Sequence, residues 1–492
     1  MGVMLFLGID LGTQGVRGLV TDEKGLIVVD GSSPFTVLNA VVEEKHYEQS
    51  ADIWIDSLVE VIGECIAGLK LKGYTAEDIT GIGIDGTSGT IIPIDSSYKP
   101  LRNALMYNDG RSDLETVKVQ KSGEELSGKL GYRFKPSFAL PKILWIKNNQ
   151  PDVFEKTRYF VHQSDFIIGF LTGNYQSSDY TNALKTGYDL IDNCWPAFIE
   201  SDLGIPLDHL PEVVTPGSIV GNVSKTASRI TGLSALTRVC AGATDGIASA
   251  LASGIKKPGD YNTTIGTTLV IKGLTDSIIS DNQGRIYSHR HPDGFWIPGG
   301  ASNTGGICLK HHFPDGNFRE MDLKVNLREP SGIITYPLTG KGERFPFQNP
   351  DAEGFVQGEI RNDVQLYTAL MEGVAFTERL SYSVMENLGC EKVDSIYTAG
   401  GAAKSDVWMQ IRANILRRRL IVPRVVEAAM GSAILAASTI AFGGTSEAVE
   451  SMVVVEKEIL PDSAAADKYE ESYEGFLAGC RKRGYTDEGE AE

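Results

Sequence analysis

Near its N-terminus the chain reads Leu7-Gly8-Ile9-Asp10-Leu11-Gly12-Thr13-Gln14-Gly15, and this segment gives the first strong indication of the fold. An apolar run breaks there into glycine and hydroxyl residues and resumes at Val16. This pattern is typical of two strands joined by a tight turn. A turn without bulky side chains exposes backbone N–H groups and hydroxyls, which are the groups that bind a triphosphate.

The same pattern occurs a second time past the midpoint of the chain. It reads Asn262-Thr263-Thr264-Ile265-Gly266-Thr267-Thr268, and an apolar run resumes at Leu269-Val270. A single Gly-Thr hairpin is weak evidence, but here each of two hairpins opens a long segment of alternating strands and helices. The pair therefore predicts an α/β protein whose two lobes hold one nucleotide between them.

The composition agrees with a large protein that binds neither nucleic acid nor a membrane. The chain has 492 residues and 42% hydrophobic content, which is enough for two large cores. Its net charge of −18 argues against a polyanionic partner. The six cysteines are scattered without the spacing of a disulfide framework or a zinc site, and the N-terminal residues lack a targeting pattern. We therefore expect a cytoplasmic protein.

The order of the expected elements gives a division into two lobes. A helix capped by Ser50 follows the first hairpin, and a buried strand over 79–84 follows that helix. The more polar region 115–193 is interpreted as an insertion on the first lobe. Pro258-Gly259-Asp260 is the best linker candidate, so we expect lobes at 1–253 and 254–492, the second ending in a charged surface tail after Glu456.

Two aspartates stand where catalytic carboxylates are needed. Asp10 ends the first strand, where it either stabilises the turn or holds Mg²⁺ or its waters against phosphate oxygens; the second hairpin favours the metal. Asp245 begins an expected helix, where it is either a plain cap or a general base that accepts the proton of an attacking hydroxyl. A helix N-terminus keeps such a carboxylate ionised.

Two glycine-rich loops have open interpretations. Asp85-Gly86-Thr87-Ser88-Gly89-Thr90 is either a sugar-binding loop or only a turn at the end of a strand. Gly400-Gly401-Ala402 either lets adenosine lie close to the backbone or serves helix–sheet packing. The chain has no Gly-x-x-x-x-Gly-Lys-Ser/Thr loop and no Gly-x-Ser-x-Gly elbow, which excludes P-loop NTPases and serine hydrolases of that type.

Taken together, these segments resemble the FGGY family of carbohydrate kinases, which is built on the actin-like ATPase fold. The resemblance extends over nearly the whole chain. Besides the two hairpins, it rests on Tyr107-Asn108-Asp109-Gly110-Arg111, Ala241-Gly242-Ala243-Thr244-Asp245-Gly246, Thr398-Ala399-Gly400-Gly401-Ala402-Ala403-Lys404-Ser405 and Ala428–Ala437. The fold class that it implies is α/β, with two actin-like (ribonuclease H-like) lobes and a nucleotide cleft between them.

The resemblance also implies roles for individual residues, with ATP and Mg²⁺ as cofactors. Asp245 would be the general base and Asp10 the Mg²⁺ residue. The sugar would contact Asp10, Thr87, Ser88, Asp109, Arg111, Asp245 and Gly246. The nucleotide would contact Gly12, Thr13, Gln14, Arg17, Gly266, Thr267 and Gly305, with Gly401, Ala402, Ser405 and Trp408 lining the adenosine pocket.

Within the family, several segments look closest to the D-ribulokinases and xylulokinase-like members. These are Ile84–Thr90, Ser178-Asp179-Tyr180-Thr181-Asn182-Ala183-Leu184-Lys185, Gly299–Asn303 and Gly342–Pro346. Typical xylulokinases carry Met-His-Gly on the sugar loop, but this chain has Gly86-Thr87-Ser88-Gly89. We expect phosphorylation of the primary hydroxyl of a ketopentose, D-ribulose first, with D-xylulose or another polyol as the alternative.

A different class of function also fits the actin-like fold: a non-catalytic sensor or chaperone driven by nucleotide. Asp245 discriminates between the two classes, because a sensor needs no base aimed at an acceptor hydroxyl. The expected partners are a sugar and ATP or ADP, with a homodimer as a further possibility.

Overall fold

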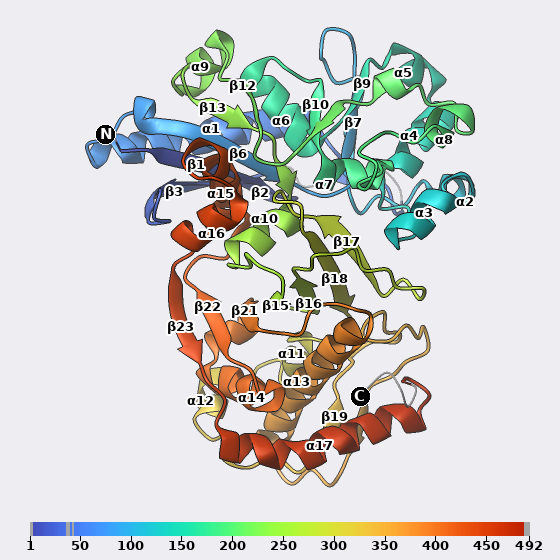
Figure 1. The fold of residues 1–492 in the computed structure, drawn as a ribbon, viewed down its shortest axis with the longest axis vertical. Helices are drawn as coiled ribbons and strands as arrows, with labels where there is room; N and C mark the ends of the chain where they lie inside the picture. Colours follow the sequence, from blue (N-terminus) through green and yellow to red (C-terminus); the bar gives the residue numbers. More distant parts are fainter. Residues whose placement is uncertain (1–2, 36–39, 42–43, 487–492) are drawn as a thin grey trace. The chain divides into compact units, whose positions relative to one another are not determined.

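The structure is a computed structural model that describes residues 3–35, 40–41 and 44–486 (Figure 1). The chain forms two compact units, each made of several chain segments. The first consists of Met1–Ala252, Arg290–Gly294 and Val425–Val454. The second consists of Ser253–His289, Phe295–Arg424 and Val455–Glu492. Within the described residues, no helix combines the length and the apolar character that a membrane span requires.

The main sheet of the first unit contains the first Gly-Thr hairpin. Its strand order is β12 (Ile219–Asn222), β13 (Arg238–Cys240), β6 (Ile79–Gly86), β1 (Leu5–Leu11), β2 (Gly15–Asp22) and β3 (Ile27–Pro34), with β14 (Ala243–Thr244) also paired to β6. β1 and β2 are antiparallel and form the predicted hairpin, whereas β6 runs parallel to β1. The register places Asp10 opposite both Arg17 and Asp85, and Ala243 opposite Asp85. The carboxyl ends of β1, β6 and β14 therefore meet at one edge.

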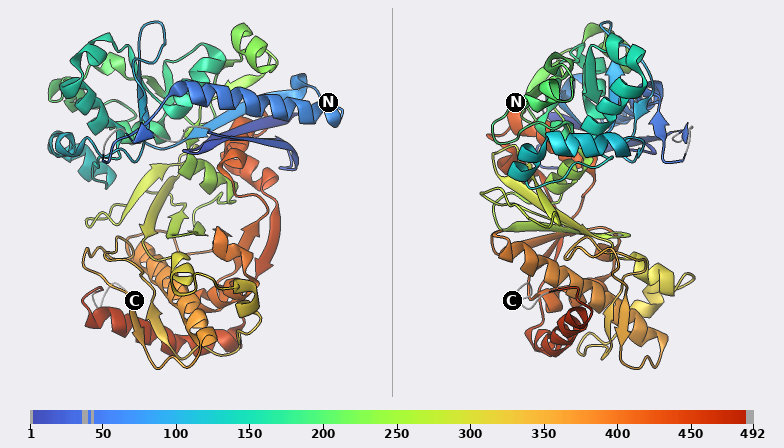
Figure 2. Two further views of the ribbon diagram at one scale, coloured as in Figure 1. Left: turned by 180° about the vertical axis from the view of Figure 1, so that it is seen from behind. Right: turned by 90° about the vertical axis from the view of Figure 1, so that its right-hand side faces the viewer.

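Two helices cover opposite faces of this sheet. α1 (Ala51–Leu71) lies along β2 and β3, and the Ser50 hydroxyl caps it by accepting the Asp52 N–H, as predicted (Figure 2). α15 (Ala428–Ile440) packs on β1 and β6. The helix packs so close to the strands that it requires glycine at two positions. A Cβ on Gly8 would lie 1.8 Å from the Ala429 carbonyl oxygen, and a Cβ on Gly83 would lie 2.0 Å from the Ser432 carbonyl oxygen. The structure thus places α15, which the sequence analysis counted with the second lobe, in the first unit.

The region expected to be an insertion has regular structure of its own. One of its strands joins a second sheet of order β4 (Ala40–Val41), β5 (Tyr47–Gln49), β8 (Ala104–Leu105), β7 (Ile91–Ile94) and β9 (Tyr159–His162). The remaining elements of the first unit are β10 (Ser177–Asp179), β11 (Glu212–Val214), α2 (Asp113–Ser122), α3 (Glu124–Leu130), α4 (Ala139–Asn149), α5 (Pro151–Lys156), α6 (Gln163–Thr172), α7 (Tyr180–Ala183), α8 (Phe198–Ser201), α9 (Lys225–Thr231), α10 (Asp245–Ala252) and α16 (Thr445–Met452).

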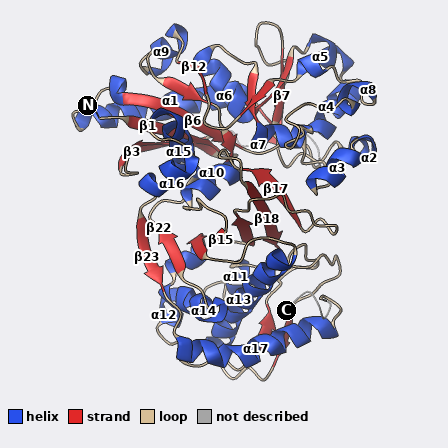
Figure 3. Ribbon diagram, in the orientation of Figure 1, coloured by secondary structure: helices blue, strands red, loops and turns tan. Residues whose placement is uncertain are grey.

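The second unit is built around the second hairpin. Its main sheet has the order β17 (Ile286–Arg290), β18 (Trp296–Ser302), β16 (Leu269–Gly273), β15 (Asp260–Ile265), β21 (Ser395–Ala399), β22 (Leu420–Pro423) and β23 (Val455–Ile459) (Figure 3). β15 and β16 are antiparallel, and β21 runs parallel to β15. The other elements are β19 (Ile334–Tyr336), β20 (Phe355–Gln357), α11 (Ile307–His312), α12 (Phe318–Asp322), α13 (Asp363–Asn387), α14 (Asp406–Leu416) and α17 (Ser463–Lys482).

The C-terminal tail differs from the surface cover that its charge suggested. Its helix, α17, buries Tyr469, Tyr473 and Phe476 in the core of the second unit. The Phe376 ring of α13 lies 5.6–6.5 Å from these three rings, centroid to centroid. The charged residues of the tail occupy the other side of an amphipathic helix, so the tail belongs to the core as well as to the surface.

Candidate active site

A cavity of about 410 Å³ in the first unit lies at the edge where β1, β6 and β14 end. The residues that line it are Asp10, Gly12, Thr13, Arg17, Thr87, Tyr107, Asp245, Ser249, Val426, Glu427 and Ala428. Six of the residues predicted from the sequence meet here: Asp10, Gly12, Thr13, Arg17, Thr87 and Asp245. They come together because ligand-binding residues of such sheets follow the carboxyl ends of parallel strands.

Three carboxyl groups, those of Asp10, Asp85 and Asp245, are crowded beside this cavity. Asp85 is fully buried and accepts a 2.7 Å hydrogen bond from the Ser432 hydroxyl, and its Oδ1 has no hydrogen-bond donor among the residues that the structure describes. Burial, followed by the charge of Asp10, raises the pKa of Asp85 well above its usual range. Burial also raises the pKa of Asp10, and the nearby Asp245 adds to this effect while Arg17 opposes it.

A divalent cation would relieve this crowding. The described residues hold no group of three or more His, Cys, Asp or Glu side chains arranged as a complete metal cage. Mg²⁺ does not need one, because it keeps several waters and is usually held by one or two carboxylates together with substrate phosphates. Asp10, which faces the cavity and whose ionised form is destabilised by its surroundings, fits that role.

Asp245 is the first residue of α10, and its side chain is exposed toward the cavity. Its Oδ1 accepts a 2.6 Å hydrogen bond from the N–H of Gly246. The carboxylate therefore stabilises its own helix terminus while its remaining oxygen stays available to another donor. Both interpretations made from the sequence, cap and base, are compatible with this geometry.

The loop after β6 is held by side-chain hydrogen bonds. Gln163 Oε1 accepts from the Thr87 backbone N–H at 3.0 Å and from its hydroxyl at 2.7 Å. Thr87 lines the cavity, whereas Ser88 does not. The Ser88 hydroxyl is buried and finds no hydrogen-bond partner within the described part of the chain. The sequence did not point to Gln163, because a residue at the start of α6 gives no pattern that connects it to this loop.

Asp109 and Arg111 are not among the residues that line the cavity. They form a two-bonded ion pair, with Arg111 Nε and Nη2 each 2.8 Å from an oxygen of Asp109. Arg111 Nη1 also lies 2.8 Å from Glu48 Oε1, and its guanidinium lies 4.9 Å from the centre of the Trp145 ring. In this structure the pair therefore links its loop to Glu48 of β5 and Trp145 of α4. Gln14 and Gly246, the other two predicted residues of this unit, are also outside the cavity lining.

The second unit has a cavity of about 500 Å³ beside its own Gly-Thr turn. Its lining is Gly266, Thr267, Gly306, Ile307, Leu309, Lys310, Phe318, Arg319, Asp322, Tyr367, Gly401, Ala402, Lys404, Ser405 and Trp408. It includes six of the predicted nucleotide residues: Gly266, Thr267, Gly401, Ala402, Ser405 and Trp408. Gly305 lies just behind it, where a Cβ would come within 2.5 Å of the Thr268 Cα.

Hydrogen bonds connect the walls of this cavity. Ser405 caps α14 by accepting the Trp408 N–H at 3.0 Å, and its hydroxyl donates to Asp322 Oδ2 at 2.8 Å. The Tyr367 hydroxyl donates to Asp322 Oδ1 at 2.8 Å. Phe318 stacks on Tyr367, with ring centroids 5.9 Å apart. The cavity thus offers aromatic and small apolar surfaces for a ring system beside the cations Lys310 and Arg319.

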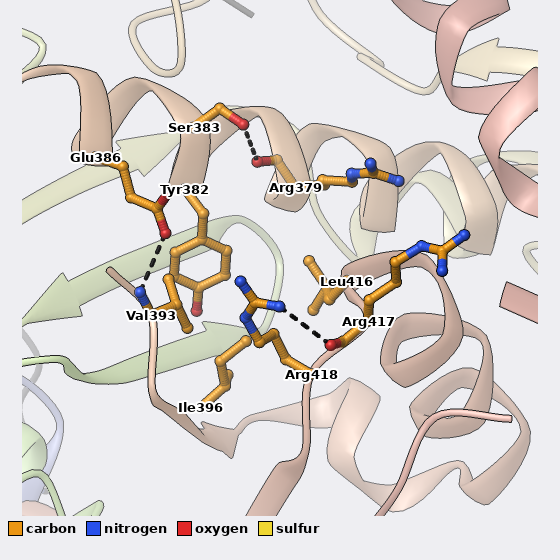
Figure 4. A pocket seen from close by; sticks show the side chains of 9 residues that line it. All are labelled: Arg379, Tyr382, Ser383, Glu386, Val393, Ile396, Leu416, Arg417 and Arg418. Carbon is orange, nitrogen blue, oxygen red and sulfur yellow. Dashed lines mark hydrogen bonds between the residues drawn. The ribbon is translucent and has the colours of Figure 1, made fainter. Parts of the chain in front are cut away.

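A smaller cavity of about 160 Å³ lies between the end of α13 and the end of α14 (Figure 4). Two of the three arginines that line it form ion pairs: Arg379 contacts Glu470 twice at 3.0 Å, and Arg417 contacts Glu470 at 2.7 Å and Asp467 at 2.8 Å. The third, Arg418, donates to the Arg417 carbonyl at 3.3 Å. None of the predicted site residues lines it. In the basic run at 417–419, which follows α14, Arg417 and Arg419 form ion pairs and Arg418 bonds to the backbone.

The comparisons with known proteins agree with this architecture. Residues 5–252 match the N-terminal domain of the FGGY family of carbohydrate kinases, and residues 262–440 match its C-terminal domain. The xylulose kinase of Bacillus subtilis (strain 168) is 28% identical over 446 residues, 88% of this chain and 87% of the relative. The gluconokinase of Bacillus licheniformis is 25% identical over 451 residues, 87% of this chain and 86% of the relative.

Solved structures show the same fold. The xylulose kinase of Rhodospirillum rubrum superposes with a TM-score of 0.85 at 25% identity, covering 97% of this chain and 98% of that one. Two α/β units of the actin-like ATPase type, together with relatives that match 87–97% of the chain, define an ATP-dependent sugar kinase. The chain belongs to the FGGY family of carbohydrate kinases.

Proposed function

We propose that this kinase transfers the γ-phosphoryl group of ATP to the primary hydroxyl of a ketopentose, with Asp245 as the general base. The observation that carries the proposal is the first-unit cavity, in which Asp245 and Asp10 lie together with the Gly12-Thr13 turn and Arg17. A carboxylate, a candidate metal residue, exposed backbone donors and a cation are the groups that phosphoryl transfer to a hydroxyl requires.

Each group in the cavity has a distinct task. Asp245 accepts the proton of the attacking hydroxyl, and its position as the first residue of α10 exposes its carboxylate to the cavity for that purpose. Gly12 and Thr13 present the turn to the phosphates, and Arg17 offsets negative charge. Asp10 would hold Mg²⁺, which when bound neutralises charge on the phosphate oxygens.

The second-unit cavity is the proposed adenosine site. Gly401 and Ala402 let the nucleoside lie close to the backbone, while Trp408 and Phe318 supply flat apolar surface. The Trp408 ring is fixed by donating its indole N–H to the Met371 carbonyl at 3.2 Å. A volume of about 500 Å³ lies within the range of sites for molecules of this size.

D-xylulose is the acceptor that the relatives favour, because several of them are named xylulose kinase. The gluconokinases match almost as well, so overall similarity does not select the sugar by itself. D-ribulose is the second candidate, and a specific observation supports it: the loop after β6 carries Thr87 and Ser88, with no histidine, at the position where typical xylulokinases have one.

The test is ATP turnover with Mg²⁺ in the presence of D-xylulose, D-ribulose, gluconate, glycerol or no sugar. We expect a ketopentose to stimulate turnover strongly and gluconate and glycerol to be poor acceptors. Turnover that does not depend on any sugar would contradict the kinase proposal and support a nucleotide-driven sensor. A clear preference for gluconate would contradict the ketopentose assignment while leaving the kinase intact.

A further inference from the structure

One short segment of the first unit, residues 178–185, contacts both the backbone that carries the proposed base and the loop after β6. We propose that this segment positions the acceptor site, with Thr181 holding the residue before Asp245 and Lys185 holding the loop at Ser88. The inference rests on the proposed function, because it concerns the placement of the base and of the acceptor. Thr181 and Lys185 are positioning residues, since neither lines the cavity.

The first contact holds the start of α10. The Thr181 hydroxyl accepts a 2.9 Å hydrogen bond from the backbone N–H of Thr244, the residue directly before Asp245. Thr181 and Thr244 are both buried, at 0% and 2% exposure. A buried N–H that loses its acceptor is costly, so this bond fixes where β14 ends and α10 begins.

Asp179 fixes the direction of that hydroxyl. Its Oδ1 accepts the Thr181 hydroxyl and also the backbone N–H groups of Thr181 at 2.8 Å and Asn182 at 3.1 Å. Its Oδ2 accepts from the Asn182 side chain at 2.6 Å. A hydroxyl has one hydrogen, so donating to Asp179 leaves its lone pairs for Thr244. Asp179 therefore orients the Thr181 hydroxyl so that its oxygen accepts the Thr244 N–H.

The second contact holds the loop after β6. Lys185 Nζ donates to the Ser88 carbonyl at 3.0 Å. The neighbouring Gly89 carbonyl accepts from Lys142 Nζ at 2.9 Å, and this fully buried amino group also donates to the Met106 carbonyl at 2.6 Å. Two lysine side chains thus hold consecutive carbonyls of the loop that carries Thr87.

This arrangement matters for rate because phosphoryl transfer to a hydroxyl depends on placement. A misplacement of about 1 Å at the reacting groups costs on the order of a hundredfold in rate. A displaced base impairs proton transfer and lowers kcat, whereas a displaced sugar loop weakens binding of the sugar and raises its KM. The two contacts therefore predict different kinetic signatures.

The experiment compares Thr181→Val and Thr181→Ser, with Thr231→Val as the matched control. Thr231 makes the same kind of bond, accepting the Leu233 N–H at 3.2 Å, but lies in α9 away from the cavity. We expect Thr181→Val to lower kcat about tenfold to a hundredfold, with the KM of ATP unchanged and that of the sugar changed by less than about threefold. Thr181→Ser keeps the hydroxyl and should restore most of kcat, and Thr231→Val should leave kcat unchanged.

The second arm compares Lys185→Met with Lys185→Arg. The methionine variant should raise the KM of the sugar by roughly threefold to tenfold with a smaller change in kcat, and arginine should restore part of the loss. If Thr181→Val does not fold, as judged by circular dichroism and ATP binding, Thr181→Ala removes the same hydroxyl with less bulk.

A folded Thr181→Val or Thr181→Ala enzyme with the kcat of the wild type would overturn the role of Thr181. An unchanged sugar KM in Lys185→Met would overturn the role of Lys185. Asp245→Asn is measured in parallel: if it keeps full activity, the proposed function has failed, whereas its loss of activity beside fully active Thr181 variants means that only the positioning inference has failed.

Discussion

Asp85 illustrates how register decides the chemistry of a residue. The sequence predicted a strand over 79–84 and placed Asp85 in the loop that follows, but in the structure β6 extends to Gly86 and includes Asp85. Pairing with β1 places it beside Asp10, and α15 covers it with Ser432. The Asp85 carboxyl therefore lies next to Asp10, the proposed metal residue. Its environment depends on α15, a helix that lies far along the chain.

Asp245→Asn tests the proposed base. An amide cannot accept the proton of the acceptor hydroxyl, so we expect kcat to fall by about 10²–10⁴-fold, with ATP binding largely retained. Steady-state kinetics and nucleotide titration measure the two effects. Asp113→Asn is the matched control, because Asp113 is also an exposed first residue of a helix and lies outside the cavity. Near-normal turnover in Asp245→Asn would exclude the assignment.

Asp165 predicts how stability depends on pH. Burial, followed by the charge of Asp179, raises its pKa to about 8. The native state therefore keeps a proton that the unfolded chain releases above about pH 4, so the free energy of unfolding falls as the pH rises toward 8. Asp165→Asn cannot ionise, and it can still accept the His162 N–H, which lies 3.0 Å from Asp165 Oδ2.

We expect this variant to gain stability over the wild type as the pH rises from 5 to 8, by a total of a few kcal/mol. Urea unfolding at each pH measures the difference. Asp152→Asn, at an exposed position, should give a flat difference. A flat difference for Asp165→Asn as well would show that this carboxyl does not retain its proton in the native state.

Some site residues could be predicted from the sequence and others could not, for physical reasons. Asp10 lies near the end of β1, Thr87 and Asp245 directly follow β6 and β14, and the carboxyl ends of neighbouring parallel strands meet. Asp322 and Phe318 could not be predicted, because they lie on a short helix without apolar periodicity. The burial of the Ser88 hydroxyl could not be predicted either, because the conformation of the turn decides whether this side chain faces the cavity or the interior.

At the scale of elements, local signals predicted the structure well. Both hairpins form as expected, and the Ser50 cap accepts a hydrogen bond from the first turn of the helix that follows. Short-range chemistry decides such features. It does not decide which sheet an apolar helix covers, so the position of α15 could not be predicted from its own residues.

Gly8→Ala tests the close packing of α15 on the first sheet. The added Cβ would lie 1.8 Å from the Ala429 carbonyl oxygen, so helix and strand must separate. We expect a loss of about 1–3 kcal/mol or more in the free energy of unfolding. Gly63→Ala in α1 is the matched control, because no atom lies within 4 Å of its added Cβ, and it should stabilise the protein by about 0.5–1 kcal/mol. Equal stability of the two variants would contradict close packing.

Phe318→Ala tests the aromatic wall that α12 contributes to the second-unit cavity. Loss of the stacked ring removes apolar contact area from the proposed nucleoside site, so we expect the KM of ATP to rise about threefold to thirtyfold. The KM of the sugar should stay constant, and Leu323→Ala, an exposed position directly after the same helix, should change neither. An unchanged KM for ATP in Phe318→Ala would place the nucleoside elsewhere.

At the scale of the whole molecule, the first unit needs segments from three parts of the chain. Residues 1–252 contain its strands, but α15 and α16 come from 425–454. We expect a fragment of residues 1–252 to lack a cooperative unfolding transition, because α15 covers the face of β1 and β6. Fusing 425–454 to that fragment through a long Gly-Ser linker should restore the transition. Circular dichroism during heating measures both, and a cooperative transition in the unfused fragment would contradict this account.

The late position of α15 in the chain also has a consequence for how the protein is made in the cell. As the polypeptide leaves the ribosome, the strands of the first sheet appear early, but the helix that covers Gly8 and Gly83 emerges only near the end of translation. During that interval the nascent sheet exposes an apolar face, which is the condition under which chains aggregate or recruit chaperones. Rapid elongation over the second half of the message should therefore favour the yield of folded kinase.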